Sequence, residues 1–362
     1  MASGLAAPLP FTVGVVVLLS LLGLAAGGKV LVVPVDGSHW LSMLEVLDGL
    51  RQRGHEVVVV APEVNLHIKP SKNIVMKMYP VPFTQEEMDE NVRGFTKDLF
   101  EGGSFLERFI RFYQRSKKSS ALFLATCTHL LYNRELMRYL EDSKFDAILT
   151  DPFLPCGQIV AEHLSVPSLF FLQQMPCGLE HQATQCPNPP SYVPRAFTDL
   201  TDHMTFLQRR VKNLLIGLSE PVLCYLFYTE YRNLASEFLQ RDVTMQELFS
   251  KASVMLMRYD FVFEFPRPVM PNMVYVGGIN CVQKKPLSEE FEAMVNASGE
   301  HGVVVFSLGS MVSEIPMKKA MEIADALGTV PQTVLWRYTG PTPPNLPKNV
   351  KLVKWLPQND LL

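Results

Sequence analysis

KVLVVPVDGSHWLSMLEVLDGLRQRGHEVVVVAP, residues 29–62, is the stretch that decides the fold. It contains two apolar runs rich in β-branched residues, at 29–34 and 55–62, which indicate buried strands. Between them, apolar residues recur at helical spacing over 41–53, and Gly54 suits the end of that helix. Continuous hydrophobic strands joined through a helix are typical of a parallel β-α-β unit, so we predict that the chain opens with a Rossmann-like domain.

The same alternation of strands and helices continues to about residue 285. Apolar runs predict further strands at 73–79, 145–149, 168–172, 253–257 and 274–276. Helical patterns predominate over 83–140 and 158–164, and 204–240 suits one long or two shorter helices; 186–194 is Pro-rich and is expected to be a loop. The pattern predicts a doubly wound α/β domain over 29–285.

A second series follows a polar stretch, and we expect residues 286–300 to be a linker. Strands are predicted at 302–306, 333–338 and 350–354, with a helix at 316–327. Two or three parallel strands with one helix cannot cover both faces of a sheet. The second domain, 301–362, is therefore expected to be incomplete in this sequence.

Composition excludes some classes of partner. The 362 residues are 48% hydrophobic, carry a formal net charge of −3 and contain no run of five like charges. This composition is globular and long enough for two domains, and it lacks the basic patch expected of a nucleic-acid-binding protein. A small, largely neutral partner is the better expectation.

The N-terminus indicates a secreted or lumenal chain. Residues 11–24 are apolar and uncharged and are followed by the small residues 25–28, so 1–28 suits a signal peptide, with an uncleaved anchor as the alternative. No later run has 18 consecutive apolar residues. We therefore expect the chain to enter the endoplasmic reticulum lumen, where the sequon at Asn296 would accept a glycan.

The cysteines are too widely spaced for a disulfide-rich scaffold or a clustered metal site. One or two disulfides, or buried thiols, remain open alternatives. The six are Cys127, Cys156, Cys177, Cys186, Cys224 and Cys281.

Six motifs, met in a fixed order, resemble those of the UDP-glucuronosyltransferases of family 1, and most closely its bilirubin and phenol branch. They are VDGSHW at 35–40, LTDPF at 149–153, ATQCP at 183–187, VGGINC at 276–281, VFSLGS at 305–310 and WLPQ at 355–358. The resemblance covers essentially the whole chain. It implies a GT-B-like fold of two Rossmann-like domains, with acceptor specificity residing in the variable N-terminal half.

Two residues of these motifs are candidates for acid–base chemistry. His39 lies just after the first strand and Asp151 ends another strand of the same sheet. Imidazole titrates near neutral pH, and a carboxylate can hold its second nitrogen. The alternatives are an ordinary loop histidine and an aspartate that caps the next helix. The resemblance favours a catalytic pair in which His39 deprotonates an acceptor hydroxyl for inverting transfer from UDP-glucuronic acid to small lipophilic acceptors.

The donor side is expected after the first strand of the second domain. Gly309 permits close backbone approach, and Ser307 and Ser310 offer hydroxyls to a phosphate, although a simple β-α turn would look the same. The resemblance also implies that Trp355 and Gln358 hold the uracil and the ribose. For Arg337, nucleotide contact and a place at the sheet edge are equal alternatives. No cofactor or metal is expected beyond the co-substrate.

The resemblance places the main UDP-binding signature, a transmembrane helix and a cytosolic tail beyond Leu362. Without the groups that grip the diphosphate, we expect the 362 residues alone to be inactive or nearly so. One alternative is a truncated, non-catalytic partner in homo- or hetero-oligomers with related transferases. Another is a lumenal lipophile-binding protein.

Overall fold

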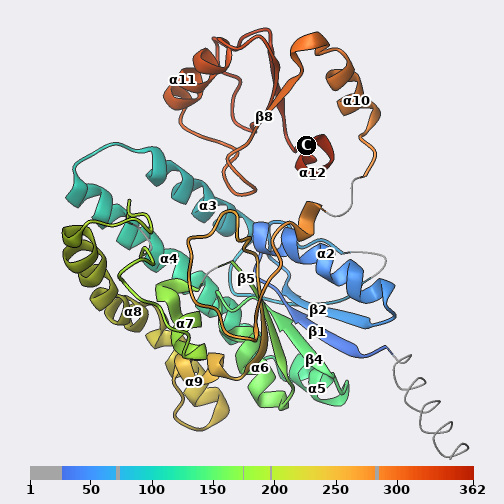
Figure 1. The fold of residues 1–362 in the computed structure, drawn as a ribbon. Helices are drawn as coiled ribbons and strands as arrows, with labels where there is room; N and C mark the ends of the chain where they lie inside the picture. The colour runs from blue at the N-terminus through green and yellow to red at the C-terminus, as the bar shows by residue number, and fades with distance from the viewer. Residues whose placement is uncertain (1–26, 71–73, 174, 196–197, 282–284) are drawn as a thin grey trace, which may run out of the picture.

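The computed structural model describes residues 27–70, 74–173, 175–195, 198–281 and 285–362. Nearly all of the predicted signal peptide lies outside these residues. Among the helices that are described, none is long and apolar enough to cross a membrane. Figure 1 shows two parallel sheets in separate halves of the molecule, the first running from blue to light orange and the second from orange to red.

The first half is built on a seven-stranded sheet, as the apolar runs predicted. Its order is β3-β2-β1-β4-β5-β6-β7, and every neighbouring pair is parallel. The strands are β1 (Lys29–Val33), β2 (Glu56–Pro62), β3 (Val75–Tyr79), β4 (Ala147–Thr150), β5 (Ser168–Leu172), β6 (Ala252–Met257) and β7 (Met273–Tyr275). The order grows outward in both directions from β1 and β4, so the topological switch point lies between these two strands.

Helices cover both faces of this sheet (Figure 1). α2 (Ser38–Gln52) packs on one face. The other face carries α4 (Phe105–Leu131), α5 (Arg134–Asp142), α6 (Cys156–Leu164), α7 (Leu179–Thr184), α8 (Leu214–Leu239) and α9 (Met245–Ser250). α3 (Gln85–Phe100) packs on α4, the short 3-10 turn η1 spans Pro176–Gly178, and the π-helical segment η2 (Gln208–Asn213) runs directly into α8.

Alternation along the strands explains why both faces are covered. In β1, Leu31 and Val33 point into the core beneath α4 and α8, whereas Val30 and Val32 point toward α2. Successive side chains of a strand face opposite sides, so a run that is apolar throughout must be buried on both. A disulfide between Cys127 and Cys156 joins α4 to α6 on the first of these faces.

The second half has a three-stranded parallel sheet of order β10-β9-β8. Its elements are β8 (Val303–Phe306), α11 (Met317–Leu327), β9 (Thr333–Arg337), β10 (Val350–Val353) and α12 (Gln358–Leu361). α11 packs on one face of this sheet. On the other face lies α10 (Glu289–Asn296), through Phe291 and Met294. The segment 286–300, expected to be a linker, is therefore largely a helix that shares the core of the second sheet, because its apolar residues recur at helical spacing.

Candidate active site

His39 lies in the first turn of α2, not in a loop as predicted. Gly37 precedes the helix with φ +80° and ψ −142°, a conformation that only glycine adopts readily, and this turn starts the helix at Ser38, three residues earlier than the apolar pattern indicated. The helix begins at the carboxyl end of β1. The His39 side chain is 26% exposed.

Asp151 follows β4, the strand beside β1, and only 1% of its side chain is exposed. Its Oδ2 lies 2.6 Å from His39 Nδ1, while its Oδ1 accepts the backbone N–H of Phe153 at 2.9 Å. An ionised carboxylate only accepts hydrogen bonds, so the pairing assigns the proton to Nδ1 and leaves Nε2 able to accept one. The capping alternative for Asp151 is wrong, because α6 begins at Cys156 with Pro155 at its N-cap position.

Both residues sit at the switch point of the sheet. The carboxyl ends of β1 and β4 are adjacent there, which is where open α/β sheets bind their ligands. The structure therefore brings together two residues that are 112 positions apart in the sequence.

Aromatic side chains stand beside the pair. The Phe153 ring centroid lies 5.7 Å from that of His39 and 6.2 Å from that of Phe227, which comes from α8. Phe153 and Phe227 are both partly exposed. They form an apolar wall next to the imidazole.

Arg258 also reaches this region and was not identified from the sequence. It follows β6, its guanidinium lies 5.5 Å from the Phe171 ring centroid, and Nη1 is 3.5 Å from the Ser38 carbonyl oxygen. Burial lowers the pKa of Arg258 from its usual value, and the Asp151 carboxylate opposes that shift. In the sequence, only its position directly after a buried strand could have identified Arg258 as a candidate site residue.

The segment 307–310, after β8, forms a tight turn. Ser307 Oγ accepts the N–H of Gly309, which has φ +92°. The Ser310 hydroxyl is buried and has no hydrogen-bond partner among the described residues. Arg337, at the end of β9, donates to the carbonyl oxygens of Gly309 and Ser310.

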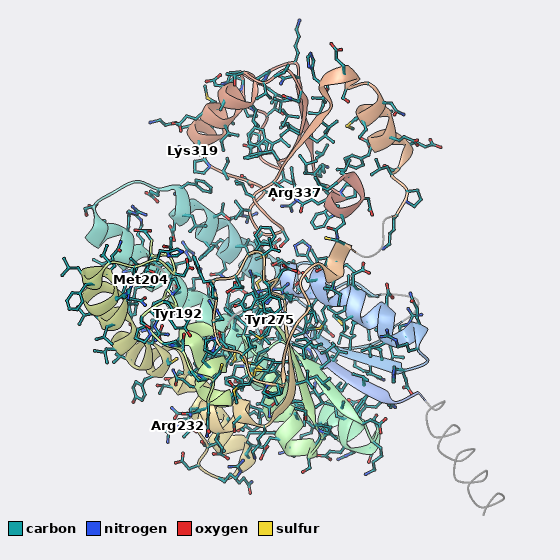
Figure 2. The ribbon with its side chains drawn as sticks, in the orientation of Figure 1. Tyr192, Met204, Arg232, Tyr275, Lys319 and Arg337 are labelled. Atoms are coloured by element: carbon teal, nitrogen blue, oxygen red, sulfur yellow. A yellow bond between two sulfur atoms is a disulfide. The ribbon has the colours of Figure 1, made fainter. Side chains whose placement is uncertain are left out.

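Arg337 therefore holds this turn in place. The sequence had suggested nucleotide contact or a place at the sheet edge for Arg337, and not this role. Its guanidinium lies 5.0 Å from the ring centroid of Trp355, which is 46% exposed. Figure 2 labels Arg337 in the part of the second half that faces the first. Gln358 begins α12 and is exposed.

Several contacts join the two halves at this place. A Cβ on Gly37 would lie 3.2 Å from Met311 Sδ, so the turn before His39 and the segment after Ser310 are close neighbours. The His67 ring centroid is 5.7 Å from that of Trp355. Asn359 Nδ2, from α12, donates to the carbonyl oxygen of Asn280 in the first half at 2.7 Å.

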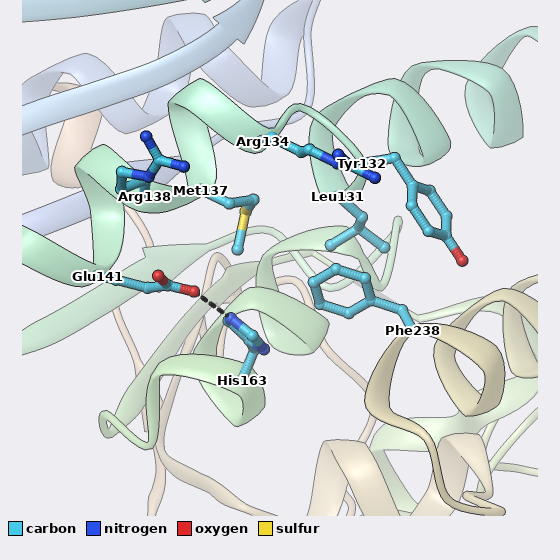
Figure 3. Close-up of a pocket in the computed structure, with 8 residues that line it drawn as sticks. All are labelled: Leu131, Tyr132, Arg134, Met137, Arg138, Glu141, His163 and Phe238. Carbon is cyan, nitrogen blue, oxygen red and sulfur yellow. Dashed lines mark hydrogen bonds and ion pairs between the residues drawn. The ribbon is translucent and has the colours of Figure 1, made fainter.

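The remaining candidates lie elsewhere. Asn296 is exposed at the end of α10. A cavity of about 350 Å³ between α4, α5, α6 and α8 contains the His163–Glu141 pair, joined at 2.8 Å (Figure 3). His163 lies near the end of α6, just before β5 begins. This cavity is therefore at the amino ends of the strands, whereas His39 is at their carboxyl ends. The described residues include no group of three potential metal ligands.

Comparison with known proteins agrees with this geometry. Residues 28–362 match the model of the family described as UDP-glucoronosyl and UDP-glucosyl transferase. The chain belongs to this family. Among its relatives, human UDP-glucuronosyltransferase 1A1 is 62% identical over 335 residues, 92% of this chain and 63% of that protein. Rat UDP-glucuronosyltransferase 1A5 is 56% identical over 99% of this chain and 67% of its own length. The chain thus spans about two thirds of the length of these transferases.

Solved structures of other glycosyltransferases share the fold. A spinosyn forosaminyltransferase aligns with a TM-score of 0.53 at 14% identity, over 92% of this chain and 72% of its own. A UDP-glucosyltransferase from Polygonum tinctorium aligns with a TM-score of 0.52 at 17% identity, over 92% and 73%. The α/β, GT-B-like arrangement expected from the sequence is confirmed.

Proposed function

We propose that the protein transfers glucuronic acid from UDP-glucuronic acid to hydroxyl groups of small lipophilic acceptors. The observation that carries this proposal is the His39–Asp151 pair, 2.6 Å apart at the switch point, with Met311, directly after the turn at 307–310, close to Gly37. The identity to UDP-glucuronosyltransferases over most of the chain supports the choice of donor.

His39 is the proposed base. Its Nε2 takes the proton of the acceptor hydroxyl, the oxygen attacks the anomeric carbon, and the bond from that carbon to the diphosphate breaks as UDP leaves. Asp151 holds the Nδ1 proton and stabilises the imidazolium that forms. Attack opposite the leaving group inverts the α-linked sugar to a β-glucuronide. This scheme uses neither a metal nor a cofactor.

The donor is proposed to lie against the second half. The 307–310 turn and the exposed face of Trp355 offer backbone amides, hydroxyls and an indole to the nucleotide, with Gln358 close by in sequence. We assign Arg337 to holding this turn rather than to direct contact, because both carbonyl groups it binds belong to the turn.

The acceptor is proposed to lie along Phe153 and Phe227. A lipophilic ring on that wall can present its hydroxyl to His39. We also propose that the protein resides in the endoplasmic reticulum lumen, carries a glycan on the exposed Asn296 and assembles with itself or with related transferases.

The test of function uses a chimera in which these 362 residues are continued by the C-terminal part of human UDP-glucuronosyltransferase 1A1 that they do not match. With a simple phenol, we expect turnover of UDP-glucuronic acid well above that of UDP-glucose, and a β-linked product by NMR. An α-linked product would contradict the inverting mechanism. A preference for UDP-glucose would contradict the donor assignment.

The 362 residues alone are expected to remain near background in this assay. The alternative of a non-catalytic partner predicts a different result: coexpressed with an intact transferase, the 362 residues would lower or raise its rate while the chimera stayed silent.

A further inference from the structure

Two cysteines that the catalytic proposal does not use lie against each other. Cys177 belongs to η1, the short turn between β5 and α7, and Cys224 lies in the N-terminal half of α8. η1 packs on α8, and the thiols of Cys177 and Cys224 are hydrogen-bonded to each other. The two elements thus bring together thiols that lie 47 positions apart (177 to 224).

The surroundings of the pair are partly buried. Cys177 and Cys224 are each half-buried, and both lie close to Tyr228, which is one turn further along α8 and almost fully buried. The Cys186 thiol makes its contact elsewhere, with the Pro268 carbonyl oxygen at 3.2 Å. Cys281 lies in the exposed η3 segment at 279–281, next to α2.

The backbone at Cys177 is unusual. It has φ +60° and ψ +19°, a left-handed conformation that is uncommon for residues other than glycine, and Gly178 after it is also left-handed at φ +63°. Such a conformation persists where contacts around it hold it in place. A covalent bond from the Cys177 side chain would be such a constraint.

We propose that Cys177 and Cys224 form a second disulfide when the protein matures in an oxidising compartment. Two S–H bonds break and one S–S bond forms, and the two protons and two electrons pass to an oxidising protein disulfide, which is reduced to two thiols. Cys127 and Cys156 already form a disulfide on the same face of the sheet, so this domain accommodates the chemistry.

The bond would fix the position of α8 on the sheet. It closes the segment 178–223, which includes the Pro-rich stretch, and constrains the unfolded chain accordingly. Phe227 lies one turn after Cys224 and contacts Phe153, which contacts His39. The disulfide would therefore hold the aromatic wall beside the imidazole, although its formation does not depend on the proposed reaction.

The test is a map of thiols in the protein expressed with its own N-terminus in a eukaryotic secretory pathway. Thiols are blocked with N-ethylmaleimide at harvest, and the denatured, unreduced protein is digested and analysed by mass spectrometry. We expect a cross-linked peptide joining Cys177 to Cys224, the Cys127–Cys156 peptide as internal control, and label on Cys186 and Cys281 only. Label on both Cys177 and Cys224, or a bond from either to another cysteine, overturns the proposal.

Single substitutions sharpen this result. Cys177→Ser is expected to add label at Cys224, and Cys224→Ser to add label at Cys177, in each case nearly complete. Cys186→Ser is the matched control and should leave the cross-linked peptide unchanged. If Cys186→Ser instead freed Cys177 or Cys224, the pairing would be wrong.

Discussion

One carboxylate secures the turn that carries the candidate base. Asp36 accepts the backbone N–H groups of Gly37 at 2.6 Å, Leu66 at 2.5 Å and His67 at 3.1 Å. It thereby ties the turn before α2 to the segment after β2. His39 on one side and His67 on the other depend on the same side chain for their positions.

Asp36→Ala should lower the free energy of unfolding by about 3 kcal/mol, because three backbone donors lose a charged acceptor. Urea unfolding followed by circular dichroism measures this. Asp48→Ala is the matched control. Asp48 is 46% exposed and, within the described part of the chain, pairs only with Arg51 of α2, so its loss should cost under about 0.5 kcal/mol. Equal effects of the two variants would show that Asp36 does not hold the turn.

Glu180 and His181 form a buried pair whose members respond to pH in opposite directions. Burial raises the pKa of Glu180 to about 7, and burial together with Arg267 and Arg195 lowers the pKa of His181 to about 4. His181 is therefore neutral at pH 7, and its Nε2 accepts from Arg267 at 3.5 Å, so its 3.7 Å approach to Glu180 is not an ion pair.

The two shifted pKa values make the stability of the fold depend on pH in opposite ways. The raised pKa of Glu180 stabilises the fold below about pH 4.5, and this contribution is lost as pH rises to about 7. The lowered pKa of His181 stabilises the fold above about pH 6.5, and that contribution is lost as pH falls to about 4. Glu180→Gln removes only the first. Relative to wild type, this variant should gain up to about 3 kcal/mol in stability between pH 5 and pH 8. Urea unfolding at several pH values measures the stability of the variant relative to wild type. If this difference in stability were the same from pH 5 to pH 8, the raised pKa of Glu180 would be contradicted.

At the scale of the element, α2 shows what a sequence pattern can and cannot predict. The apolar periodicity predicted the body of the helix, and apolar runs predicted all ten strands, because the burial of neighbouring side chains leaves a local signal. The start of α2 was missed, since it depends on the conformation of Gly37 and on Met311 packed against it. A contact with the other half of the molecule, such as that between Gly37 and Met311, leaves no pattern in the neighbouring sequence.

Gly37, just before α2, and Gly49, within it, allow a matched test. Gly37→Ala should cost about 1–3 kcal/mol, because its positive φ excludes a side chain and its Cβ would crowd Met311. Gly49→Ala should stabilise by up to about 1 kcal/mol, because Gly49 is helical and a Cβ there meets nothing within 4 Å. Thermal unfolding should move the two variants in opposite directions; a shift of the same sign in both would contradict this account of the helix start.

At the scale of the whole molecule, the candidate site exists only where the two halves meet. The sequence indicated His39, Asp151 and the 307–310 turn through motifs; the structure pairs His39 with Asp151 and brings Met311, directly after that turn, against Gly37. It did not indicate Arg258, which lacks a motif, or the bracing contacts of Arg337, which require the carbonyl groups of Gly309 and Ser310 to point toward it. Side chains that act through tertiary contacts become visible only in the fold.

The most direct test of the central claim is the steady-state rate of the chimera with His39→Ala, using UDP-glucuronic acid and a phenol. His163→Ala is the control, because His163 is an exposed histidine with its own carboxylate partner at the amino ends of the strands. We predict that His39→Ala lowers kcat by about 10²–10⁴-fold while the protein remains folded at the assay temperature, and that His163→Ala stays within about twofold of wild type. Full activity of the His39→Ala variant would show that His39 is not the base.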